Sequence, residues 1–169
     1  MNNTFKVSSL ELPTPFSVGT VNVYLLEAEP LTLIDTGVQT PEAESVLNKG
    51  LSDLGYSLKD IKRIFITHSH YDHSGLAGRI SAVYGADVYI HPMEVSNMKG
   101  WVNLVRRKAA VCLAGGIPRE IFNEIINTVQ MGESLVKSPE DYIPLIGGEL
   151  LPFDGFDLGA CCKSSFTES

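Results

Sequence analysis

The sequence predicts an α/β fold in which short apolar strands alternate with amphipathic helices. Three observations support this prediction. The first third of the chain has the β-branched and alternating character of strands. The run at residues 64–66 is apolar without a break, as in a strand covered on both faces. Helical patterns precede and follow that run, and the order strand, helix, strand, helix, strand predicts parallel pairing with right-handed crossovers.

The N-terminal elements are predicted as three strands and a helix. Strands are expected at residues 5–10, 20–28 and 31–37, and a Glu-Pro pair joins the second to the third as a hairpin. The helix begins at Thr40, which can cap it, and has proline at its first position and acidic residues in its first turn. Leucines recur at helical spacing until Gly55, which can end the helix.

The remaining elements continue the alternation within one domain of 169 residues. A strand is expected at residues 61–67, a helix at 76–85 and another strand at 86–92. Residues 93–136 carry two apolar stripes at helical spacing and are predicted to be a helical insertion, which would form a lid. Turn-rich β structure follows, and residues 160–169 are expected to be an irregular tail.

The composition narrows the class of protein and partner. The formal net charge is −7, so neither nucleic acid nor an anionic membrane surface is an expected partner. No apolar run is long enough to cross a bilayer, and no secretory signal is visible. The three cysteines are an odd number and include the adjacent pair Cys161 and Cys162, which suits no disulfide framework. A reducing, cytoplasmic compartment is therefore expected.

A metal site is predicted at residues 67–73, which read Thr-His-Ser-His-Tyr-Asp-His. Side chains two apart on a strand point to one side, so His68 and His70 can hold one ion together. Asp72 and His73 follow before the next helix and can face a second ion or a shared water. Imidazole suits zinc and other transition metals, and carboxylate adds a hard oxygen ligand. The cluster also follows a strand, where ligands of α/β sheets gather.

These residues resemble the His-x-His-x-Asp-His motif of the metallo-β-lactamase superfamily. The likeness extends to "VNVYLLE" and "LTLIDTG" upstream and to "ADVYIHPME" downstream, with a weaker echo in "ELLPFDGFDLG". The resemblance implies an α/β/β/α sandwich that binds one or two metal ions, usually zinc, with iron or manganese as alternatives. It also implies a hydrolase whose small-molecule substrate is an ester, thioester, lactone, amide or phosphoester. Fold alone does not choose among these substrates.

The resemblance also implies a role for each residue of the cluster. His68 and His70 would ligate the first ion, and Asp72 and His73 would ligate the second. Asp72 would in addition orient or deprotonate the attacking water, as the catalytic residue. Asp35, in "LIDTG", would not ligate but would hold the metal loop in place.

The chain departs from the family pattern because no histidine follows His91. In the family, the remaining ligands come from the second half of the sandwich. The chain is therefore expected to be a truncated form, with the first half of the sandwich and a helical insertion. His91 itself ends a strand beside the cluster and is a conceivable but not favoured substitute ligand. The cysteine pair is a weaker candidate, and the aspartates of "FDGFD" are better explained by a turn.

Two alternative functions stay open at this point. The chain is either the hydrolase or an inactive half-domain that binds metal weakly and depends on an oligomer or a complementing chain. A more remote alternative is an aspartic-protease half-site at Asp35, because Asp-Thr-Gly also opens the active-site loop of that class. That alternative requires a dimer and leaves the histidine cluster unexplained.

Overall fold

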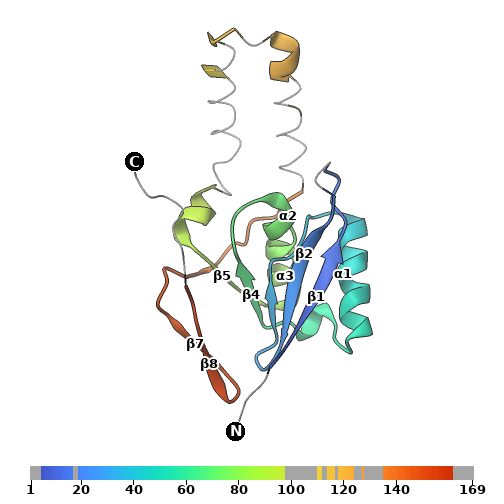
Figure 1. The fold of residues 1–169 in the computed structure, drawn as a ribbon, viewed down its shortest axis with the longest axis vertical. Coiled ribbons are helices and arrows are strands. Elements are labelled where there is room, and N and C mark those ends of the chain that lie inside the picture. The colour runs from blue at the N-terminus through green and yellow to red at the C-terminus, as the bar shows by residue number, and fades with distance from the viewer. Residues whose placement is uncertain are drawn as a thin grey trace.

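A computed structural model describes residues 5–16, 19–97, 110–111, 114–116, 118–123, 127 and 135–161. Figure 1 shows the described strands gathered beside a group of helices. The strands are β1 (Lys6–Leu12), β2 (Val21–Glu27), β3 (Thr32–Ile34), β4 (Arg63–Ile66), β5 (Asp87–Ile90), β6 (Ile143–Pro144), β7 (Leu150–Phe153) and β8 (Phe156–Gly159). The helices are α1 (Pro41–Asp53), the 3-10 turn η1 (Leu58–Asp60), α2 (Tyr71–Ser74) and α3 (Ala77–Tyr84).

Six strands form one sheet in the order β1-β2-β3-β4-β5-β6, and β7 pairs with β8 in a second, two-stranded sheet. The first three strands are antiparallel, and Tyr24 lies opposite Ile34 in the predicted hairpin. Strands β3, β4 and β5 are parallel, as the alternation of strands and helices predicted. The mixed sheet with helices confirms the predicted α/β class. Aspartic proteases have an all-β fold, so this architecture does not suit that alternative.

Helix α1 begins and ends close to its predicted bounds. The side chain of Thr40 accepts a hydrogen bond from the Ala43 backbone, and Pro41 takes the first helical position. This arrangement satisfies one of the free N–H groups at the helix start, which typically stabilises a helix by about 1 kcal/mol. Leu47 and Leu51 then face the sheet and are fully buried.

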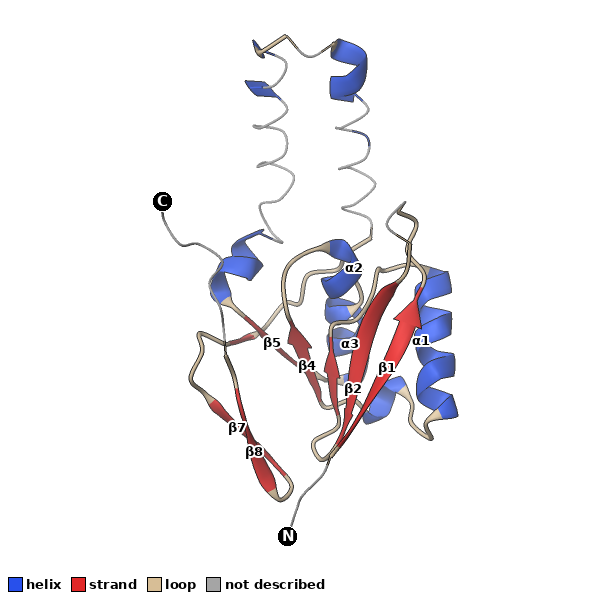
Figure 2. Ribbon diagram, viewed as in Figure 1, coloured by secondary structure: helices blue, strands red, loops and turns tan. Residues whose placement is uncertain are grey.

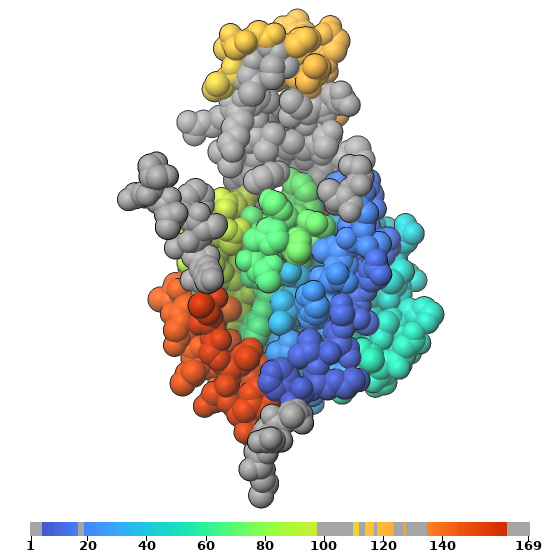
Figure 3. Space-filling model, in the orientation of Figure 1, coloured from blue at the N-terminus to red at the C-terminus, as the bar shows by residue number. Residues whose placement is uncertain are grey.

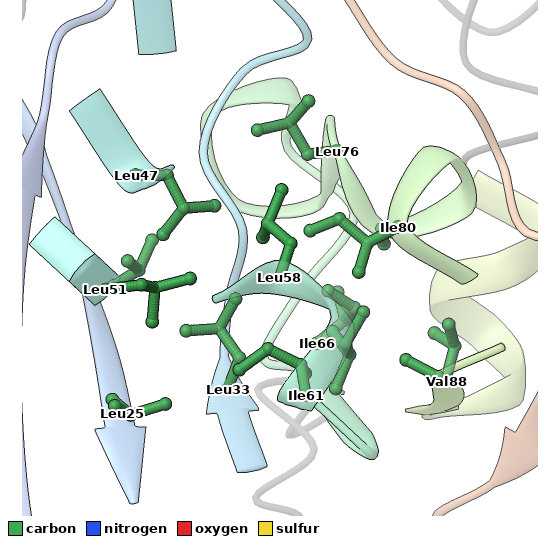
Figure 4. Close-up of a cluster of buried hydrophobic side chains, with 14 of the residues drawn as sticks. Leu25, Leu33, Leu47, Leu51, Leu58, Ile61, Ile66, Leu76, Ile80 and Val88 are labelled. Carbon is green, nitrogen blue, oxygen red and sulfur yellow. The ribbon is translucent and has the colours of Figure 1, made fainter. Parts of the chain in front are cut away.

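The main core lies between the sheet and the helices α1 and α3, which Figure 2 shows on the same side of the strands. Leucine and isoleucine side chains from α1, α3, β3, β4 and η1 meet there, as drawn in Figure 4. Leu33, Ile64, Leu76 and Ile80 are at most 1% exposed. Burying such a side chain stabilises the fold by about 1.5–3 kcal/mol, so this core fixes the strand ends that carry the polar loops.

A smaller core lies on the opposite face of the sheet, where the β7–β8 hairpin covers Phe65 and Tyr89. The guanidinium of Arg63 donates to the backbone oxygen of Pro152 at 2.7 Å. Phe5 stacks on Phe156 with ring centroids 4.7 Å apart. In Figure 3 the hairpin accordingly lies alongside the first strand at one end of the molecule.

The described part of the predicted helical insertion is small. Residues 92–97 and 119–123 are helical, but most of the stretch at residues 93–136 lies outside the described residues. The predicted tail at residues 160–169 also lies largely outside them, apart from Ala160 and an exposed, free Cys161. None of the described helices combines the length and the apolar character needed to span a membrane.

Candidate metal centre

The histidine cluster lies in the loop that leaves β4 and in the one-turn helix α2. Strand β4 ends at Ile66, one residue earlier than predicted, so His68 and His70 lie in the loop. Asp72 and His73 lie within α2, a one-turn helix that was not predicted, and both precede α3, the helix that the sequence predicted after them. The ring centroids of His68 and His70 are 4.5 Å apart, and those of His68 and His73 are 4.1 Å apart. The structure thus brings the three predicted imidazoles together.

Asp35 holds this loop from the end of β3. Its backbone has φ +59°, a left-handed conformation in which aspartate is one of the few tolerated non-glycine residues. The carboxylate is buried and accepts hydrogen bonds from the backbone N–H of Thr67 at 2.9 Å and from its hydroxyl at 2.8 Å. The N–H bonds to Oδ1, whereas the hydroxyl at this distance bonds to Oδ2, which also lies 2.7 Å from Nδ1 of His73. One buried carboxylate therefore contacts both ends of the histidine loop.

The hydrogen bonds determine which ring nitrogen of His68 carries a proton. The hydroxyl of Thr67 has a single hydrogen, and it lies within hydrogen-bond distance of Asp35 and, at 3.0 Å, of Nδ1 of His68. An ionised carboxylate only accepts, so the hydroxyl donates to Asp35. Nδ1–H of His68 then donates to the hydroxyl. This arrangement leaves the Nε2 lone pair of His68 available to a ligand.

The same carboxylate determines the tautomer of His73. Nδ1–H of His73 donates to Asp35, so in the neutral ring the lone pair is on Nε2, which lies 3.6 Å from Oδ2 of Asp72. The hydrogen bond to Asp35 raises the pKa of His73 above its ordinary value, despite an opposing effect of burial. Metal-ligating histidines in proteins typically donate their other N–H to a carboxylate in this way.

The pKa of His68 shifts in the opposite direction. Burial lowers the pKa of His68, and the charges on His73 and His70 lower it further. The neutral imidazole is therefore the favoured form of His68 near neutral pH. Neutral imidazole is the form that binds metal ions.

Thr36 connects the Asp35 segment to α2, a role that sequence reasoning missed. Its backbone N–H donates to the carbonyl oxygen of His73 at 2.7 Å, and its hydroxyl donates to the same oxygen at 3.1 Å. The hydroxyl oxygen also accepts from the backbone of Leu76 at 3.2 Å. Thr36 is fully buried. The signal available in the sequence was its place between Asp35 and Gly37 in "LIDTG".

His91 lies at the same edge of the sheet, because β5 is parallel to β4. Nδ1 of His91 accepts a hydrogen bond from the backbone N–H of Met93 at 3.3 Å, and its carbonyl accepts from Glu94 at 2.9 Å. His91 is thus the residue that caps the helix at residues 92–97. In this tautomer Nε2 carries the proton, so neither ring nitrogen has a free lone pair. That His91 is not a ligand stays a prediction.

The donor set fits a divalent transition metal in chemistry and in tautomer. Two imidazoles have their Nε2 atoms available, and the carboxylate of Asp72 lies beside one of them. Within the part of the chain that the structure describes, no group of three histidine, cysteine, aspartate or glutamate side chains has the geometry to hold one ion. The described residues therefore offer at most two ligands to any single ion, fewer than the three protein ligands usual for catalytic zinc.

Comparison with known proteins relates this geometry to a family. The family described as "Metallo-beta-lactamase superfamily" matches residues 17–158. The protein named "Probable metallo-hydrolase YqjP" from Bacillus subtilis (strain 168) is 45% identical over 73 residues, which are 43% of this chain and 23% of that protein.

Solved structures show the same fold. The metallo-beta-lactamase family protein TTHA1429 from Thermus thermophilus is 31% identical, with a TM-score of 0.76 over 92% of this chain and 50% of that one. A beta-lactamase domain protein from Burkholderia ambifaria is 18% identical, with a TM-score of 0.64 over 89% of this chain and 44% of that one, and supports the fold alone. The chain thus spans about half the length of these solved relatives. On the family match and the shared fold, the chain belongs to the metallo-beta-lactamase superfamily.

Proposed function

We propose that the chain carries the metal-binding loop of a metal-dependent hydrolase that acts on a small molecule with an ester, thioester, lactone, amide or phosphoester bond. The observation that supports this most is the arrangement around Asp35. One buried carboxylate, directly and through Thr67, orients two imidazoles so that the lone pair of each neutral ring is on Nε2. Histidines that ligate metal ions usually donate their other ring N–H to such a partner.

The residues divide the work as follows. His68 and His70 would hold one zinc ion, and Asp72 and His73 a second, with iron or manganese as alternatives. A divalent ion bound there would supply a water that is nucleophilic near neutral pH. Asp72 would accept the proton of that water, and Asp35 would keep the ring of His73 in its ligating tautomer.

The experiment loads the chain with zinc, removes unbound metal by dialysis and measures hydrolysis of one chromogenic probe from each bond class. We expect turnover above the free-zinc background, lost on chelation and in His70→Ala. His70→Ala is informative because this ring is exposed, so its loss leaves the core intact. Turnover that is unchanged in His70→Ala would refute the proposal.

A second function is favoured by the limit of two ligands per ion among the described residues. In this alternative the chain is an inactive half-domain that binds metal weakly, and another chain or copy supplies further ligands. Zinc retention that rises with protein concentration, without turnover, would support it. Stoichiometric zinc after dialysis in a monomeric, active chain would exclude it.

A further inference from the structure

The backbone of Ser69, the residue between the two histidines predicted to share an ion, is hydrogen-bonded at both its N–H and its carbonyl oxygen. The backbone N–H of Ser69 donates to Oε2 of Glu94 at 2.8 Å. The carbonyl oxygen of Ser69 lies 3.2 Å from the hydroxyl of Ser74, which shares its one hydrogen between this oxygen and the carbonyl oxygen of His70 at 3.0 Å. Ser69 is only 9% exposed and Ser74 is fully buried, so water does not readily replace either partner.

Glu94 reaches this peptide from a different part of the sheet. It is the third residue of the helix at residues 92–97, which His91 caps and which follows β5. The loop of Ser69 follows β4, the neighbouring parallel strand. The contact therefore joins two strand ends at one edge of the sheet, across 25 positions of the sequence.

The hydrogen bond to Ser69 is charge-assisted. The pKa of Glu94 lies below its ordinary value. Burial has the largest single effect and raises this pKa, but hydrogen bonds from Ser69 and Asn97 and the charge on His68 together lower it by more. The carboxylate is therefore ionised near neutral pH. Hydrogen bonds from backbone N–H to a carboxylate are shorter and stronger than neutral ones, and a buried N–H left without a partner is costly.

The position of Ser69 gives this bond a consequence for the metal site. The two peptide groups that flank Ser69 carry His68 on one side and His70 on the other, so rotation of its backbone moves the two rings relative to each other. We propose that Glu94 is a positioning residue, whose carboxylate fixes the Ser69 peptide and thereby the spacing of His68 and His70. This role deepens the proposed function and rests on it only where metal binding is concerned.

Two variants at position 94 separate the effect of side-chain length from the effect of charge. Glu94→Gln keeps an acceptor oxygen at the same distance without the charge, whereas Glu94→Asp keeps the charge on a side chain one methylene shorter. Glu140→Asp is a matched control, because Glu140 is exposed. NMR on the metal-free chain measures hydrogen exchange of the Ser69 amide and the ring signals of His68 and His70. Competition with a chromophoric chelator measures zinc affinity.

In Glu94→Asp we expect the Ser69 amide to lose protection, the ring signals of His68 and His70 to shift, and zinc affinity to fall about tenfold, as for other partners of metal ligands. Glu94→Gln keeps the acceptor oxygen but loses the charge assistance, so it is expected to lose part of the protection and of the affinity, and less of both than Glu94→Asp. Equal loss in both variants, or wild-type behaviour of Glu94→Asp, would overturn the proposal. If wild type binds no zinc while the amide and ring signals respond as expected, the proposed function fails but the positioning role stands.

Discussion

Replacing Asp35 with asparagine should invert the tautomer of His73 without disturbing the fold. Asparagine tolerates the left-handed backbone at φ +59°, as aspartate does, and its carbonyl oxygen can still accept the Thr67 N–H. Its NH2 group replaces the oxygen that lies 2.7 Å from Nδ1 of His73. The amide then donates to Nδ1, and the proton moves to Nε2, where a metal ion would bind.

The expected magnitude follows from the bond that is lost. A hydrogen bond to a charged group contributes about 1.5–3 kcal/mol. If the ligating tautomer is disfavoured by that amount, zinc affinity falls about 10- to 100-fold, since about 1.4 kcal/mol corresponds to a factor of ten. Mutation of residues that hydrogen-bond to metal ligands typically lowers metal affinity by the same range, about 10- to 100-fold.

Two assays read this change in Asp35→Asn. Long-range proton–nitrogen NMR of the metal-free protein reports the protonated ring nitrogen of His73, and chelator competition reports zinc affinity. Asp141→Asn, at an exposed position, is the control. An unchanged His73 tautomer with wild-type zinc affinity would refute the reasoning that Asp35 acts through this ring.

Three further predictions follow from other contacts. Thr67→Val removes the hydroxyl between Asp35 and His68, so the His68 ring should populate both tautomers by NMR; a single Nδ1–H form would contradict this. A methyl group at Gly78 would lie 2.3 Å from the backbone oxygen of Lys137. Gly78→Ala should therefore lower the free energy of unfolding, measured by urea denaturation, by about 1–3 kcal/mol or more. An unchanged midpoint of urea unfolding would contradict this prediction. Because the folded-state pKa of His73 is raised, its protonation contributes fully to the free energy of unfolding below about pH 6.5, and this contribution is lost as pH rises through the raised pKa. Urea unfolding of the metal-free chain at a series of pH values should show this loss. A free energy of unfolding that does not change over this pH range would contradict the prediction.

The sequence predicted those parts of the fold that are written in periodic patterns. The cap at Thr40 and the leucines of α1 gave that helix nearly its observed bounds, because capping and helical spacing are local properties. The apolar run of β4 and its flanking helices gave the parallel order. The three histidines and the aspartate of the site lie within residues 67–73, so the cluster could be recognised from the sequence alone.

The supporting contacts of the site were not predictable in the same way. Thr36 and Glu94 act on residues that lie 37 and 25 positions away, and hydrogen bonds over such separations leave no periodic signal in one sequence. Helix α2 was missed as a separate element because one turn of polar residues has no apolar stripe. It is held instead by the buried hydroxyl of Ser74, which donates to the carbonyl oxygens of Ser69 and His70. These contacts depend on how strand ends meet, which is a property of the assembled sheet.

The central claim is that the loop at residues 67–73 is the metal centre of this chain, and titration of the full chain with zinc, followed by long-range proton–nitrogen NMR, tests it most directly. The account predicts that the Nε2 signals of His68, His70 and His73 shift on addition of zinc, while the ring signals of His91 stay in place. Because NMR detects weak binding, the test does not depend on turnover. Zinc-induced shifts confined to His91, or no shift of any ring at millimolar zinc, would contradict the account.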